Sequence, residues 1–115
     1  MTRVLVCGGR DFNDHDRVFA VLDDVHQERW ISEIIYGCAT GADQLARDWA
    51  RYRGRESTGF PADWKRHGKA AGPIRNARMI EEGKPDLVIA FPGGKGTANM
   101  VAQARAAGIE VIEVS

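Results

Sequence analysis

The stretch Leu87-Val88-Ile89-Ala90-Phe91-Pro92-Gly93-Gly94-Lys95-Gly96-Thr97 decides how this chain folds. Its first five residues are apolar, three glycines follow within four positions, and an alanine-rich segment then runs from Ala98 to Ala107. This order predicts a buried strand, a glycine loop and a helix. The backbone N–H groups of such a loop, together with the positive end of the helix, form an anion site. We therefore expect a phosphate group to bind here, rather than the loop being only a tight turn.

The beginning of the chain repeats this design. Arg3-Val4-Leu5-Val6-Cys7 is a short apolar run, and Gly8-Gly9-Arg10-Asp11 follows it. Apolar residues at helical spacing then predict a helix from about Asp14 to Glu28, capped by Asn13 or Asp14. The strand–glycine–helix order resembles a dinucleotide loop, although the G-x-G-x-x-G spacing is absent. Arg10 is either a bidentate clamp on a phosphate or a solvated surface side chain.

A third loop of small residues follows the second predicted strand, Glu33–Tyr36. It reads Gly37-Cys38-Ala39-Thr40-Gly41-Ala42-Asp43, and the helix after it ends before Gly54. Thr40 is the expected N-cap, and Cys38 is expected to be a small buried residue. Asp43 either stabilises the positive end of the helix, or contacts a ribose hydroxyl or assists hydrolysis.

The middle of the chain holds the weakest strand signal and the most basic segment. Residues 56–60 are short and polar, which favours a strand at the edge of the sheet. The segment from Pro61 to Gly72 is predicted to be the longest irregular stretch. Within it, Trp64 precedes several basic residues, so it either covers a base or phosphate or packs on the core.

Two further helices and one strand complete the pattern. Gly72-Pro73-Ile74-Arg75-Asn76 opens a helix with Pro73 at its first position, and Gly83-Lys84-Pro85 ends it. Arg75 in the first turn opposes the helix dipole, which predicts an anionic partner. Thr97 is the expected cap of the last helix, Gly108 ends that helix, and Glu110–Val114 is a final edge strand.

Strands and helices thus alternate, with five strands and four helices in one domain spanning residues 1–115. Such alternation predicts a Rossmann-like, three-layer α/β sandwich with a mostly parallel sheet in the order 3-2-1-4-5. Ligands of these folds bind at the carboxyl ends of the strands, near the topological switch point. The candidate binding residues converge there: Gly8, Gly9, Arg10, Gly37, Thr40, Gly41, Asp43, Trp64, Arg75, Asn76, Pro92, Gly93, Gly94, Gly96 and Thr97.

Composition narrows the classes of partner. The formal net charge is zero, so neither nucleic acid nor a membrane surface is an expected partner. No apolar run is long enough to cross a membrane, and the N-terminal residues do not resemble a signal peptide. Cys7 and Cys38 form neither a disulfide framework nor a zinc motif. We expect free thiols, a cytoplasmic location, and no metal or cofactor.

Four motifs in order resemble the SLOG superfamily, most closely its small YspA-like, YpsA-related branch. They are Val4–Asp11, Gly37–Asp43, Gly72–Asn76 and Phe91–Thr97. The resemblance implies a Rossmann-like fold that binds nucleotides or their derivatives. The superfamily's LOG phosphoribohydrolases have a loop similar to Pro92–Thr97, with a glutamate three residues after the threonine. This chain has Met100 at that position, and Arg75-Asn76-Ala77-Arg78 matches their upstream Arg-Lys motif only loosely.

Two functions follow from these residues. The first is a binding module or sensor for a nucleotide-derived ligand. The second is an N-glycosidic hydrolase using the same pocket, with Asp43 as the candidate catalytic carboxylate and Asp11 and Asp63 as further candidates. A structural or DNA-associated role, as in the DprA relatives, is a weaker alternative. We also expect a homodimer, because short strands and alanine-rich helices leave a limited core.

Overall fold

Five parallel strands form one sheet in the order β3-β2-β1-β4-β5, which confirms the predicted fold class and strand order. The computed structural model describes all residues from 1 to 115. The strands are β1 (Thr2–Cys7), β2 (Ile31–Tyr36), β3 (Glu56–Gly59), β4 (Leu87–Ala90) and β5 (Glu110–Glu113). Strands β2 and β3 lie on one side of β1, and β4 and β5 lie on the other. The topological switch point is therefore between β1 and β4.

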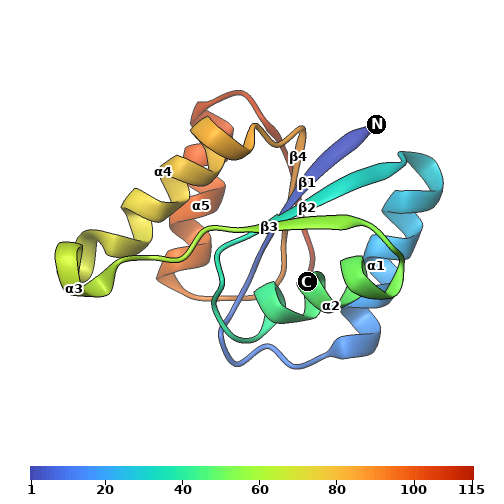
Figure 1. Cartoon of the computed structure of the whole chain (residues 1–115), viewed down its shortest axis with the longest axis horizontal. Helices are drawn as coiled ribbons and strands as arrows, with labels where there is room; N and C mark the ends of the chain where they lie inside the picture. Colours follow the sequence, from blue (N-terminus) through green and yellow to red (C-terminus); the bar gives the residue numbers. More distant parts are fainter.

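Four long helices cover the two faces of the sheet (Figure 1). On one side lie α1 (His15–Glu28) and α2 (Ala42–Tyr52), and on the other lie α4 (Ala71–Gly83) and α5 (Lys95–Ala106). The core is accordingly divided into two clusters, one around Trp49 and Phe91 and one around Met79 and Met100. This arrangement is the expected three-layer sandwich. No helix combines the length and the apolar character needed to cross a membrane.

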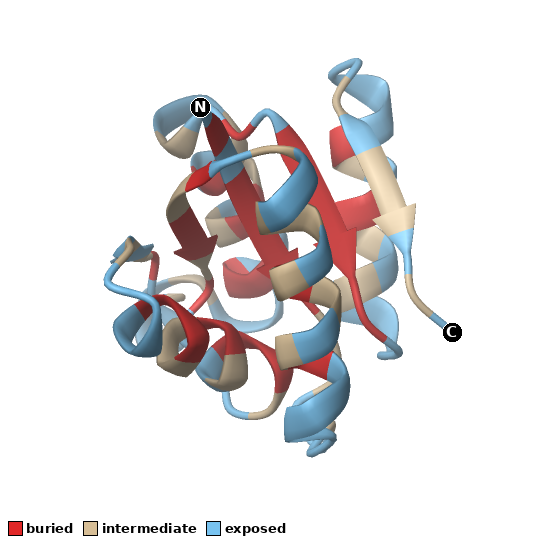
Figure 2. Ribbon diagram, turned by 90° about the vertical axis from the view of Figure 1, so that its right-hand side faces the viewer, coloured by how far each residue is buried: buried red, intermediate tan, exposed pale blue.

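The central strands are buried on both faces, as their continuous apolar runs predict (Figure 2). Val4 of β1 pairs with Ile34 on one side and with Leu87 on the other, and none of the three is exposed. At the carboxyl ends, Cys7 pairs with Ala90. The glycine loops that follow β1 and β4 therefore begin side by side.

The prediction of an irregular segment from Pro61 to Gly72 is wrong. A short helix, α3 (Trp64–His67), and a 3-10 turn, η1 (Gly68–Ala70), lead directly into α4 at Ala71. The carboxylate of Asp63 accepts a hydrogen bond from the Arg66 N–H and caps α3. Because η1 continues into α4, Pro73 is the third residue of that helix and not the first.

Of the three helix caps predicted from the sequence, at Asn13 or Asp14, at Thr40 and at Thr97, the structure confirms only the first. Asp14 caps α1 by accepting a hydrogen bond from the Arg17 N–H at 3.0 Å. Thr40 and Thr97 are not caps, because α2 and α5 begin after Gly41 and Gly94 and have no side-chain cap. Glycine at both caps leaves the first N–H groups of these helices without a side-chain acceptor.

Candidate functional site

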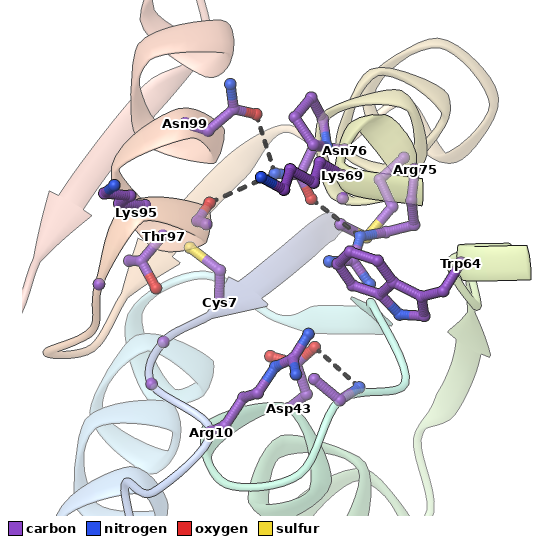
Figure 3. Close-up of a pocket in the computed structure, with 18 residues that line it drawn as sticks. Cys7, Arg10, Asp43, Trp64, Lys69, Arg75, Asn76, Lys95, Thr97 and Asn99 are labelled. Atoms are coloured by element: carbon purple, nitrogen blue, oxygen red, sulfur yellow. Dashed lines mark hydrogen bonds between the residues drawn. The ribbon is translucent and has the colours of Figure 1, made fainter. Parts of the chain in front are cut away.

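A cavity of about 580 Å³ lies at the carboxyl ends of the strands, between the loops that follow β1 and β4 and the start of α4 (Figure 3). Its volume falls in the range of small-molecule sites. The cavity brings together ten of the predicted site residues: Gly8, Gly9, Arg10, Asp43, Trp64, Arg75, Asn76, Gly94, Gly96 and Thr97.

The other five predicted residues do not line the cavity, and they lie in the loops that build it. A Cβ atom on Gly41 would lie 2.6 Å from the carbonyl oxygen of Arg10, and one on Gly93 would lie 2.7 Å from the nitrogen of Gly9. Both glycines therefore allow neighbouring loops to touch. The others contribute hydrogen bonds to these loops. Gly37 N–H donates to Asp43, the Thr40 hydroxyl donates to the Arg10 carbonyl, and the Pro92 carbonyl accepts from Gly9 N–H.

The N-terminus of α5 opens into the cavity. Its first intrahelical hydrogen bond runs from Ala98 N–H to the Gly94 carbonyl at 3.0 Å. The N–H groups of Lys95, Gly96 and Thr97 therefore have no acceptor within the helix. A Cβ atom on Gly94 or Gly96 would meet nothing within 4 Å, so this backbone is open to a ligand. An uncapped helix end of this kind favours an anion.

The charges that line the cavity are predominantly positive. Arg10, Lys69, Arg75 and Lys95 face a single carboxylate, Asp43, whereas the whole chain has a net charge of zero. The cavity is thus a local cationic region on a neutral protein. Such a region concentrates anionic ligands.

Arg75 lies in the second turn of α4 and not in its first, so the expected conflict with the helix dipole is largely absent. Its Nη1 donates to the Gly37 carbonyl at 2.6 Å, and its Nε donates to Asn76 Oδ1 at 2.9 Å. Burial lowers the pKa of Arg75, Asp43 raises it and Arg10 lowers it. Its Nη2 forms no hydrogen bond within the protein, so that nitrogen is available to an anion.

Asp43 is the only carboxylate of the cavity and is 6% exposed. Its Oδ2 accepts hydrogen bonds from Gly37 N–H at 3.0 Å and Ala39 N–H at 3.4 Å. Burial raises the pKa of Asp43 to about 6, although these two hydrogen bonds and Arg75 act in the opposite direction. Its Oδ1 makes no hydrogen bond within the protein. Asp43 therefore combines an ionisation near neutral pH with a free acceptor.

Trp64 forms part of the cavity wall and is 49% exposed, so it is not a core residue. The guanidinium carbon of Arg10 lies 5.3 Å from the centre of its ring, a cation–π contact. An aromatic face at the rim of a polar cavity can stack on a planar ring.

Sequence reasoning missed eight further lining residues: Cys7, Ala39, Lys69, Gly72, Pro73, Met79, Lys95 and Asn99. Lys95 stands within the glycine motif and Lys69 within the basic segment, so both could have been found. The thiol of Cys7 is no nucleophile, because burial raises its pKa to about 12.

Cys38 is exposed, which contradicts the expectation of a buried residue. Its backbone has a φ of 60°, a left-handed conformation that is uncommon for a residue other than glycine. Burial still raises the pKa of its thiol, as does the charge of Asp43, while Arg75 and Arg47 act in the opposite direction. No group of three or more His, Cys, Asp or Glu side chains could hold a metal ion.

The fold and the cavity at its switch point define a Rossmann-like α/β protein. The profile of one family, YAcAr, the YspA, cpYpsA-related SLOG family, matches residues 2–67, and the chain belongs to this family. The chain is also 38% identical over 122 residues to the Gene 61 protein of Mycobacterium phage D29, covering 97% of this chain and 95% of that protein.

Two solved structures share the fold at low sequence identity. MurG from Acinetobacter baumannii superposes with a TM-score of 0.61 at 16% identity, and covers 98% of this chain. DNA processing protein A (DprA) from Streptococcus pneumoniae superposes with a TM-score of 0.55 at 19% identity, and covers 97% of this chain. This chain spans only 34% of the MurG chain and 58% of the DprA chain. These likenesses concern the fold alone.

Proposed function

We propose that this protein binds a nucleotide or a nucleotide-derived ligand in the cavity, as a sensor or binding module. The observation that carries the proposal is the uncapped N-terminus of α5, which opens into a cavity lined by four cations and one carboxylate. A phosphate group satisfies both the free N–H groups and the excess positive charge. Membership of a SLOG family supports a nucleotide-related role in general terms.

The ligand lies across the cavity in this proposal. Its phosphate accepts hydrogen bonds from the N–H groups of Gly96 and neighbouring residues of α5. Its ribose donates a hydroxyl hydrogen bond to the free oxygen of Asp43. Its base stacks on Trp64, whose ring is half exposed at the rim. Arg10 and Arg75 supply positive charge between these positions.

A second candidate function, N-glycosidic hydrolysis of a nucleotide, is favoured by Asp43. A carboxylate with a pKa of about 6 can accept a proton at neutral pH and can stabilise an oxocarbenium-like centre. The alternatives, Asp11 and Asp63, do not line the cavity, and Asp63 caps α3. Met100 is 1% exposed in the core, so no acid or base replaces the glutamate of the LOG enzymes.

One experiment separates these functions. We would measure the thermal unfolding of the protein with nucleoside mono-, di- and triphosphates, ADP-ribose, NAD and cyclic dinucleotides. Each sample would then be examined by chromatography for released base. A ligand at about 100 times its dissociation constant should add about 2.7 kcal/mol to the free energy of unfolding, a shift of several degrees. A shift with intact ligand is the expected result, released base would favour the hydrolase, and no shift at all would contradict both.

The proposal includes a homodimer in the cytoplasm. Trp30 and Tyr52 are 52% and 77% exposed, and large exposed aromatic side chains are enriched at protein interfaces. Both cysteines are free, and the exposed thiol of Cys38 suits a reducing compartment.

A further inference from the structure

Asn76 lies at the centre of a hydrogen-bond network between α4 and α5. It is 3% exposed, and each of its side-chain polar atoms has a partner. Its Oδ1 accepts from Arg75 Nε at 2.9 Å. Its Nδ2 donates to the Gly96 carbonyl at 3.3 Å and to Asn99 Oδ1 at 3.1 Å. Figure 3 shows these bonds along one side of the cavity.

The partners of Asn76 fix the direction of its amide group. The guanidinium of Arg75 can only donate, and the carbonyl of Gly96 can only accept. The side chain at position 76 must therefore present an acceptor to α4 and a donor to α5 at the same time. Aspartate could not donate to Gly96. Alanine would leave the Arg75 Nε–H without its acceptor and would remove the side-chain bond from position 76 to α5.

We propose that Asn76 is a positioning residue that holds Arg75 and the glycine loop at a fixed separation, and that it does not bind the ligand itself. Sequence reasoning placed Asn76 among the ligand-binding residues, but its hydrogen-bonding capacity is used within the protein. The inference rests on the proposed function, because it takes the N-terminus of α5 and Arg75 as two parts of one anion site. Asn76 connects these two parts directly.

The same network provides a matched control. Gln103 Nε2 donates to the Pro73 carbonyl at 3.1 Å and to Asn99 Oδ1 at 2.8 Å, and so also joins α4 to α5. Gln103 contacts neither Arg75 nor Gly96 and does not line the cavity. Gln103→Ala therefore removes a bond between the same helices while it leaves the bonds from Asn76 to Arg75 and Gly96 in place. A purely structural role for Asn76 would make the two variants equivalent.

The test compares wild type, Asn76→Ala, Asn76→Asp and Gln103→Ala by ¹⁵N–¹H NMR. The first readout, without ligand, is hydrogen exchange at the Arg75 Nε–H. We expect slow exchange in wild type, Gln103→Ala and Asn76→Asp, and fast exchange in Asn76→Ala. The second readout is the affinity for inorganic phosphate, followed at the Gly96 amide. We expect both Asn76 variants to bind phosphate about tenfold or more weakly, and Gln103→Ala to bind as wild type does. Asn76→Ala loses the charged hydrogen bond from Arg75, whereas Asn76→Asp keeps it, loses the bond to Gly96 and adds a negative charge beside the anion.

Several results would overturn the inference. Wild-type phosphate affinity in Asn76→Ala would do so, as would an equal loss of affinity in Gln103→Ala. If an Asn76 variant does not fold, a measurement on the wild type replaces it. The hydrogens of the Asn76 side-chain amide should exchange slowly with and without phosphate. Rapid exchange in the ligand-free protein would contradict the positioning role of Asn76. If phosphate changes the chemical shift of no amide in α5, the proposed anion site is wrong. The hydrogen-exchange measurements then still test the hydrogen bonds of Asn76.

Discussion

At the scale of single residues, Asp43 has the least favourable environment in the cavity. Its carboxyl group is nearly out of contact with water, and its hydrogen bonds together with the nearby arginines do not offset the cost of burial. The protein therefore keeps a charged group where a neutral one would be more stable. Residues of this kind gather at functional sites.

Replacing Asp43 with asparagine should stabilise the protein at neutral pH. The pKa of Asp43 rises from 3.8 to about 6 on folding, so the protonated form favours the folded state. This stabilisation is complete below about pH 3, where the unfolded chain is also protonated, and is lost as pH rises through 6. Asp43→Asn removes the dependence, so its advantage over wild type should grow by about 2.4 kcal/mol between pH 4 and pH 8. Urea unfolding at the two pH values measures it, and an advantage that does not change with pH would contradict the account.

Single residues also show which features of the site can be predicted from the sequence and which cannot. The sequence could indicate Gly94, Arg10 and Asp43 as site residues, because their types and positions after strands carry a chemical meaning. It could not indicate that Asn76 is used within the protein, because that depends on a hydrogen bond to Gly96, twenty residues away. Nor could it indicate that Cys38 is exposed and has a left-handed backbone, which is uncommon for a residue other than glycine.

At the scale of elements, the glycines in the loops allow the backbones of neighbouring loops to pack in direct contact. Gly41 has a φ of 76°, and its Cα lies against the backbone of the β1 loop. The sequence predicted the strand–glycine–helix units because apolar runs and glycines alternate so regularly. It did not predict α3, because a tryptophan followed by three basic residues is too short to show periodicity, and only the cap at Asp63 marks the helix.

Gly41→Ala should destabilise the protein more than Gly54→Ala does. Both glycines have positive φ, so each substitution costs about 1–2 kcal/mol of backbone strain. A Cβ at Gly54 meets nothing within 4 Å, whereas one at Gly41 would clash with the backbone at Gly9 and Arg10. We expect an additional loss of about 1–3 kcal/mol at Gly41, measured by urea unfolding. Equal losses in the two variants would show that the loops do not rely on this contact.

At the scale of the whole molecule, the strand order brings four separate segments to one cavity. Alternating strands and helices predict a parallel sheet with short, right-handed connections, and 3-2-1-4-5 is one of the common orders that satisfy these rules. The charge distribution was less accessible to sequence reasoning. A net charge of zero gave no indication that four cations face one carboxylate in the folded chain.

We expect the protein to be a dimer in solution. The exposed side chains of Trp30 and Tyr52 leave apolar surface that a second copy can cover. Light scattering coupled to size-exclusion chromatography should give about twice the 12.7 kDa mass of the chain. The monomer mass at micromolar concentration would reject the dimer.

The central claim is that a phosphate group binds at the N-terminus of α5. Gly94→Val places a side chain in open space within the cavity, and we expect the fold to stay intact because nothing lies within 4 Å of the added Cβ. Ala98→Val, on an exposed position of the same helix outside the cavity, is the matched control.

The most direct measurement is calorimetric titration of both variants and the wild type with the nucleotide that stabilises the wild type most. We predict that Gly94→Val binds at least about tenfold more weakly, with an unchanged midpoint of thermal unfolding, while Ala98→Val binds as the wild type does. Wild-type affinity in a folded Gly94→Val protein would show that the phosphate binds elsewhere.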